Sequence, residues 1–143
     1  YRGHEEREMG FRRVIAEEFS HLNIVELNEI EDSREKAYSE TIALLKRHPD
    51  LAGTYNLGAG NQGIGQALMD SGKSDSVIFI GHELTESTKR LLLNGTMDAV
   101  IDQNPRVEAR EALATLMSSI KGEPFDQQPP RVQVIFRENI PEN

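Results

Sequence analysis

Four short stretches of the sequence group carboxylates, amides and an imidazole in a way that suits binding of hydroxyl-rich molecules. They are Glu29-Ile30-Glu31-Asp32, Gly58-Ala59-Gly60-Asn61, His82-Glu83 and Asp102-Gln103-Asn104. Such side chains pair with hydroxyls through forked hydrogen bonds. Each well-made bond to a charged group contributes roughly 1.5–3 kcal/mol. This chemistry is typical of a site for a sugar or polyol.

The pattern Gly58-x-Gly60-x-x-Gly63 indicates a different chemistry. Its glycines would let the backbone approach a pyrophosphate at a helix N-terminus, as in dinucleotide-binding proteins. Glu83 lies twenty positions after Gly63, where an acid that binds ribose is expected. However, the dinucleotide pattern normally opens the first strand–helix unit, and here a helix, a strand and a helix are predicted before Gly58. The alternative is a tight strand-to-helix turn that packs closely.

Patterns for other catalytic and metal sites are absent from the sequence. There are no cysteines, which excludes disulfides, zinc–thiolate sites and cysteine nucleophiles. The four histidines are scattered, and the sequence has neither a Gly-x-Ser-x-Gly elbow nor a phosphate loop. We therefore predict a protein that is not an enzyme, with no catalytic residues, no metal and no cofactor.

Alternating helices and strands must position the polar stretches. Apolar residues at helical spacing predict helices over 5–20, 61–71 and 84–94. Two more helices are predicted, one capped by Ser33 and one starting at Pro105. Strands are predicted over 24–27, 51–57, 76–81, 99–101 and 131–137. The alternation predicts an α/β fold, a three-layer α/β/α sandwich with a mostly parallel sheet of four parallel strands. The polar stretches would then gather beyond the carboxyl ends of the strands.

Each polar residue at this edge also has an ordinary structural explanation. Asp32 or Ser33 could cap one helix, and Asn61 could cap the next. Gln103 could be a polar loop residue, and His82 a loop histidine whose hydrogen bonds are satisfied by the protein. The site hypothesis therefore depends on whether the fold brings these residues together.

Length and charge limit the classes of partner. The 143 residues fit one domain, and 37% hydrophobic with 28% charged residues is typical of a globular chain. The net charge of -8 disfavours binding of DNA or anionic membranes by this chain alone. No apolar run approaches the roughly 20 residues of a membrane span.

Five motifs together resemble the second lobe of LacI-type transcriptional regulators and periplasmic sugar-binding proteins. The resemblance runs from about Glu5 to Pro141, and the C-terminal motif favours the regulators. The motifs are Arg7-x-x-Gly10-Phe11, His48-Pro49-Asp50-Leu51-Ala52-Gly53-Thr54-Tyr55, Ile80-Gly81-His82-Glu83-Leu84-Thr85, Asp102-Gln103-Asn104-Pro105 and Arg137-Glu138-Asn139-Ile140-Pro141.

The resemblance implies one lobe of a type I periplasmic-binding-protein-like clamshell that binds a sugar or related metabolite. Residues 1–124 would form the C-terminal lobe, and 125–143 a linker and strand returning to an N-terminal lobe. The sequence departs from the family at Asp32, where some members place an aromatic residue that stacks on the sugar. The ligand-binding residues implied are Arg7, Asp32, Asn61, His82, Glu83 and Gln103.

The resemblance also implies partners beyond this chain. A LacI-type regulator binds DNA through a headpiece absent from these 143 residues, acts as a homodimer in the cytoplasm without a membrane partner, and responds to a small-molecule effector. One alternative is the sugar-binding receptor of an ABC transporter. The other, less favoured, is a nucleotide-binding enzyme that uses the Gly58-x-Gly60-x-x-Gly63 turn.

Overall fold

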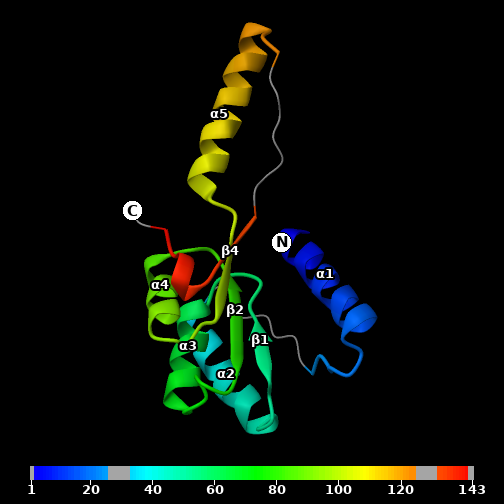
Figure 1. The fold of residues 1–143 in the computed structure, drawn as a ribbon, viewed down its shortest axis with the longest axis vertical. Helices are drawn as coiled ribbons and strands as arrows, with labels where there is room; N and C mark the ends of the chain where they lie inside the picture. The colour runs from blue at the N-terminus through cyan, green and yellow to red at the C-terminus, as the bar shows by residue number, and fades with distance from the viewer. Residues whose placement is uncertain (1, 26–32, 125–131, 142–143) are drawn as a thin grey trace.

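The computed structural model describes residues 2–25, 33–124 and 132–141 (Figure 1). The predicted alternation of helices and strands is confirmed from residue 33 onward, with shifted boundaries. The predicted strand over 24–27 is not seen at Ile24 and Val25, and its other residues lie outside the described ones. The elements are α1 (Arg2–Glu18), α2 (Arg34–Arg47), β1 (Gly53–Tyr55), α3 (Asn61–Asp70), β2 (Ile78–His82), α4 (Glu86–Leu93), β3 (Ala99–Asp102), α5 (Pro105–Lys121), β4 (Gln133–Ile135) and the 3₁₀ helix η1 (Arg137–Asn139).

The sheet has the order β1-β2-β3-β4. The first three strands are parallel, with Tyr55 opposite Ile80 and His82 opposite Ile101. β4 runs antiparallel to β3, with Ile135 opposite Val100. The expected mostly parallel sheet is therefore confirmed.

Three of the four parallel strands that we expected are seen as β1, β2 and β3. The fourth, over 24–27, falls partly outside the described residues. The strand predicted over 131–137 pairs with β3 in the antiparallel direction as β4. The physical reason is burial, because Ile135 is only 3% exposed and belongs to the hydrophobic core. The proposed division of the chain at residue 124, with 125–143 returning to an N-terminal lobe, stays a prediction.

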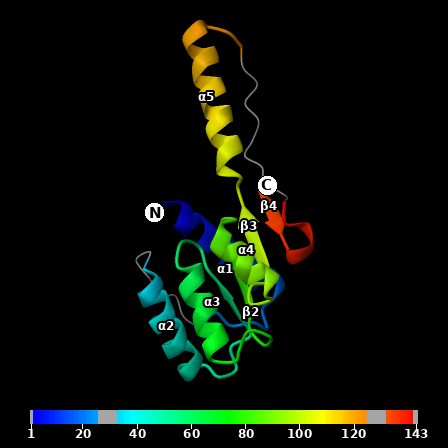
Figure 2. The ribbon, with the colours of Figure 1, turned by 90° about the vertical axis from the view of Figure 1, so that its left-hand side faces the viewer.

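Helices lie on both sides of the sheet. The views in Figures 1 and 2 place α3 and α4 on one side, with α2 beside α3, and α1 on the opposite side. The core between the sheet and α3 and α4 is built from Leu68, Phe79, Leu92 and Val100, each fully buried. Burying one such side chain contributes about 1.5–3 kcal/mol. This is the expected α/β/α arrangement.

Local signals explain where the helices begin. The Ser33 side chain accepts a hydrogen bond from the Lys36 backbone N–H at 3.2 Å, so its predicted capping role is confirmed. Asn61 is not a cap, because Gly60 occupies that position with a left-handed φ of 92°. The alternative explanation of Asn61 as a helix cap is therefore wrong, and its amide is available for another role.

Helix α5 projects away from the rest of the molecule (Figures 1 and 2). The predicted helix starting at Pro105 is confirmed, but no residue of α5 is buried. Leu113, Leu116, Met117 and Ile120 are each more than half exposed. Among the described residues, this face has nothing to pack against.

Candidate ligand-binding site

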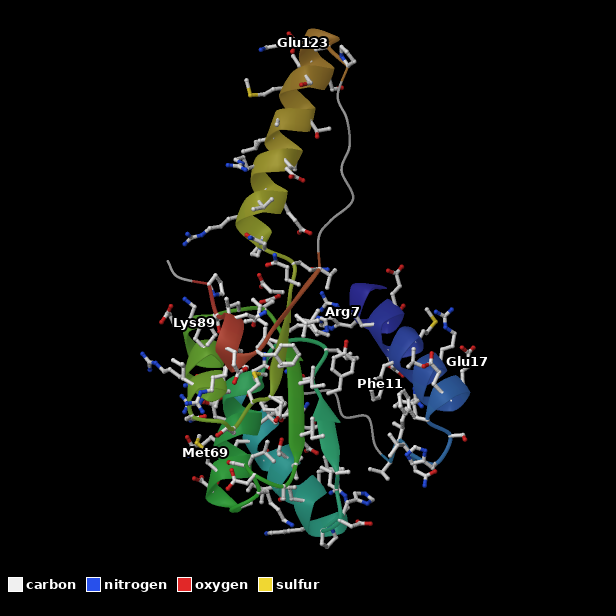
Figure 3. All side chains as sticks on the ribbon, in the orientation of Figure 1. Arg7, Phe11, Glu17, Met69, Lys89 and Glu123 are labelled. Carbon is white, nitrogen blue, oxygen red and sulfur yellow. The ribbon has the colours of Figure 1, made fainter. Side chains whose placement is uncertain are left out.

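The carboxyl ends of the parallel strands lie next to α1. β1 ends at Tyr55, β2 at His82 and β3 at Asp102. Figure 3 shows the Arg7 and Phe11 side chains of α1 directed towards the sheet, while Glu17 points away from it. The predicted polar edge is therefore present, and α1 flanks it.

Arg7 joins two parts of this edge. Its Nη1 donates to the Leu57 backbone oxygen at 2.8 Å, just after β1. Its Nη2 donates to Gln103 Oε1 at 3.3 Å, just after β3. Two residues that the sequence placed in the site, 96 positions apart, are thus brought into contact.

His82 and Tyr55 form a hydrogen-bonded pair beside Arg7. The Tyr55 hydroxyl and His82 Nε2 are 2.8 Å apart, and their ring centroids are 5.6 Å apart. Phe11 packs on the other side of Tyr55, with 5.0 Å between the two ring centroids. Sequence reasoning missed Tyr55 and Phe11 as site residues, although both lie in motifs that carry the family resemblance. The sequence feature that could have identified Tyr55 as a site residue is its position near the end of a predicted strand.

The environment keeps His82 neutral. Its side chain is 5% exposed. Burial, together with the positive charges of Arg7 and His4, lowers the pKa of His82 to about 4. Burial raises the pKa of Tyr55, which the nearby Arg7 charge partly offsets. The pair therefore joins a neutral phenol to a neutral imidazole near pH 7.

Asn61 fastens the loop after β1 to the end of β2. Its Nδ2 donates to the His82 backbone oxygen at 2.9 Å, and its Oδ1 accepts from Asn56 Nδ2 at 2.8 Å. A Cβ at Gly81 would collide with the Asn61 side chain, so glycine is needed there. Asn61 thus holds two strand ends together, and its contact with a ligand stays a prediction.

The remaining polar residues occupy the rim of the edge. Glu83 is exposed, with a left-handed φ of 70°. Thr85, and not Glu83, caps the following helix. The Asp102 carboxylate is used internally, accepting from the Leu84 and Asn104 backbone N–H groups at 3.0 Å each. Asp32, also predicted to bind ligand, lies outside the described residues.

The glycine turn is explained by packing. A Cβ at Gly63 would collide with the Arg34 backbone oxygen and approach the Ala37 Cβ to 2.9 Å, so this glycine lets α2 and α3 come together. A Cβ at Gly58 would lie 2.7 Å from His4 Cε1. Both positions favour the tight, closely packed turn over a cradle for a pyrophosphate.

The described part of the chain lacks two further features. No cluster of three or more histidine or carboxylate side chains is arranged to hold a metal ion there. None of the helices in that part combines the length and apolar character of a membrane-crossing segment.

The chain belongs to a known family. The sequence profile of the periplasmic binding protein domain matches residues 2–124. No curated protein matches the sequence. The fold is one lobe of the periplasmic-binding-protein-like architecture, with an open, mostly parallel sheet.

Several solved structures contain the same fold within a longer chain. GanP, a glucose-galactose binding protein from Geobacillus stearothermophilus, is 23% identical with a TM-score of 0.85, over 95% of this chain and 49% of that one. An ABC transporter solute binding protein from Agrobacterium vitis with bound D-fucose is 23% identical with a TM-score of 0.84, over 93% and 46%. A carbohydrate transporter solute binding protein from Agrobacterium radiobacter, in complex with D-arabinose, is 21% identical with a TM-score of 0.86, over 94% and 46%. The chain thus spans about half the length of these proteins.

Proposed function

We propose that this chain is one lobe of a carbohydrate-binding protein and that the ligand binds at the carboxyl edge of the sheet. The observation that carries this proposal is the hydrogen bond from Arg7 to Gln103, which joins α1 to the end of β3 near His82. The solved relatives with bound D-fucose and D-arabinose support the ligand class. A second lobe would close over this edge and complete the site.

Each predicted residue has a role in this proposal. The free N–H groups of Arg7 and the amide of Gln103 bind ligand oxygens. The Glu83 carboxylate accepts from ligand hydroxyls, and the Asn61 amide holds the loops on which the others lie. Asp32, outside the described residues, stays a predicted ligand-binding residue.

Isothermal titration calorimetry of the intact protein tests the site. The ligand panel is D-glucose, D-galactose, D-fucose, D-arabinose and the corresponding polyols. Because hydrogen bonds to charged groups contribute about 1.5–3 kcal/mol, the double variant Arg7→Ala, Glu83→Ala should bind at least about tenfold more weakly. Arg12→Ala is the matched control, since Arg12 pairs with Glu8 on α1 and not with the edge. Binding that survives the double variant unchanged would refute the site assignment.

We further propose that the whole protein is a LacI-type regulator whose DNA affinity depends on the ligand. Its headpiece, its partner subunit and its DNA contacts would lie outside this chain, in a cytoplasmic homodimer. The ligand would act by binding the closed and open arrangements with different affinities, since only a differential affinity shifts such an equilibrium. The resemblance of the Arg137–Pro141 ending to regulators supports this assignment.

The second candidate is the receptor of a sugar transporter, which the solved relatives favour. DNA binding distinguishes the two. A regulator retards DNA from its own promoter region, and the ligand changes that retardation. A receptor binds no DNA under the same conditions and fractionates outside the cytoplasm.

A further inference from the structure

The centre of the candidate site presents hydrogen-bond donors. Arg7 has five N–H groups, and its bonds go to two neutral oxygens, those of Leu57 and the Gln103 side chain. Among the residues that the structure describes, no carboxylate forms an ion pair with Arg7. Because Gln103 Oε1 is occupied by Arg7, the amide NH₂ of Gln103 is left to donate.

His82 adds another donor to this group. A phenol is a stronger acid than a neutral imidazole, and an imidazole nitrogen is a stronger base than a phenol oxygen. The Tyr55 hydroxyl therefore donates to His82 Nε2 across their 2.8 Å separation. The ring proton then lies on Nδ1, which is buried and has no hydrogen-bond partner among the described residues. Buried polar groups are nearly always paired, so this atom calls for an acceptor.

Two side chains at this edge already use their acceptor oxygens. Asn61 Oδ1 accepts from Asn56, and both oxygens of Asp102 accept backbone N–H groups. Among the described residues, no acidic side chain therefore pairs with the charge of Arg7. Burial lowers the pKa of His82, and the positive charge of Arg7 adds to that shift. A half-buried guanidinium with spare donors is best matched by a carboxylate, which it binds in a forked geometry.

We propose that the ligand is an acidic carbohydrate, and that its carboxylate binds Arg7 and the Gln103 amide. This inference rests on the proposed carbohydrate site and specifies its ligand class. The sugar hydroxyls would face Glu83 at the rim, where the free carboxylate accepts from them. Tyr55 acts as a positioning residue, since it sets which nitrogen of His82 donates.

Calorimetry of the intact protein with matched pairs of ligands tests the proposal. The pairs are D-galacturonate with D-galactose and D-glucuronate with D-glucose, at pH 7 and at two salt concentrations. At least one uronate should bind tenfold or more tightly than its neutral parent. Its affinity should fall with added NaCl, because a charge–charge contact at a partly exposed site is screened.

Variants separate the contributions of the donors. Arg7→Lys keeps the charge and loses the fork, so uronate affinity should fall while any binding of the neutral parent changes less. Arg12→Lys, on the same helix, should leave both affinities unchanged. If the neutral sugars bind as tightly as the uronates, the inference is wrong and the proposed function stands. If none of the four sugars nor any member of the neutral panel binds, the proposed function itself fails, and the inference with it.

Discussion

At the scale of single residues, Tyr55 determines how His82 can bond. Their contact joins the ends of β1 and β2, and it lies beside Arg7 from α1. A histidine at this position offers a donor or an acceptor depending on its tautomer, and its neighbour decides which.

Replacing Tyr55 by Phe should change the tautomer of His82. The wild-type ring should carry its proton on Nδ1, because the Tyr55 hydroxyl occupies Nε2. The Tyr55→Phe variant removes that constraint, so the Nε2–H form should become populated. Two-bond ¹H–¹⁵N correlation spectra of the imidazole report the tautomer directly. Tyr38→Phe is the control, because Tyr38 donates to Asp70 away from the site. A wild-type His82 protonated on Nε2 would rule out this arrangement.

His82 should also make the fold sensitive to acid. Its pKa falls from the ordinary 6.5 to about 4 in the folded chain, because burial and the charges of Arg7 and His4 disfavour the imidazolium. Between these two values the unfolded chain binds the extra proton, so stability is full above pH 6.5 and is lost as the pH falls towards 4. The slope approaches about 1.4 kcal/mol per pH unit for one proton. Urea unfolding of wild type and His82→Gln at pH 7, 6 and 5 measures it. Parallel curves for the two proteins would contradict the shift.

At the scale of elements, the close approach of α2 and α3 depends on one glycine. Gly63 lies where a Cβ would collide with the backbone of Arg34. The two helices form the most extensive pair of elements in the described chain. Their contact sets the position of the first turn of α3, where Asn61 lies.

Gly63→Ala should therefore destabilise the chain by about 1–3 kcal/mol, through overpacking. Gly10→Ala tests the same substitution on α1, where a Cβ meets nothing within 4 Å. There the gain in helix propensity should stabilise by up to about 1 kcal/mol. Chemical unfolding of both variants measures the difference. Equal effects at the two positions would show that α2 and α3 are farther apart than described.

At the scale of the whole molecule, the chain has a packed body and a projecting helix (Figure 1). The body contains the sheet, the core and the candidate site. α5 contributes no buried residue. Leucine side chains therefore occupy two different environments, some in the core of the body and others exposed on α5.

Truncating these leucines should have unequal effects on the 143-residue chain. Leu92→Ala removes a fully buried side chain and should cost about 2–5 kcal/mol. Leu116 is 56% exposed, so Leu116→Ala should change the free energy of unfolding by less than about 0.5 kcal/mol. Urea titrations followed by circular dichroism compare the two. A large loss from Leu116→Ala would mean that α5 packs on the body.

The sequence by itself determined the elements and the edge to which the site belongs. Helical periodicity and the Ser33 cap are local signals, because neighbouring residues along the chain produce them. The continuous apolar run Val77-Ile78-Phe79-Ile80 marked a strand in the same way, although Ile78 is 57% exposed. Because parallel strands end at the same edge of a sheet, the sequence alone predicted that His82 and Gln103 lie near one edge.

Only the tertiary structure decided which of these residues touch and what they touch. The pairing of Tyr55 with His82, the bond from Arg7 to Gln103 and the antiparallel direction of β4 all join residues far apart in the chain. No local pattern encodes such contacts, because they depend on how whole elements pack. The exposure of α5 has the same origin, since an apolar stripe predicts a buried face but not the surface that covers it.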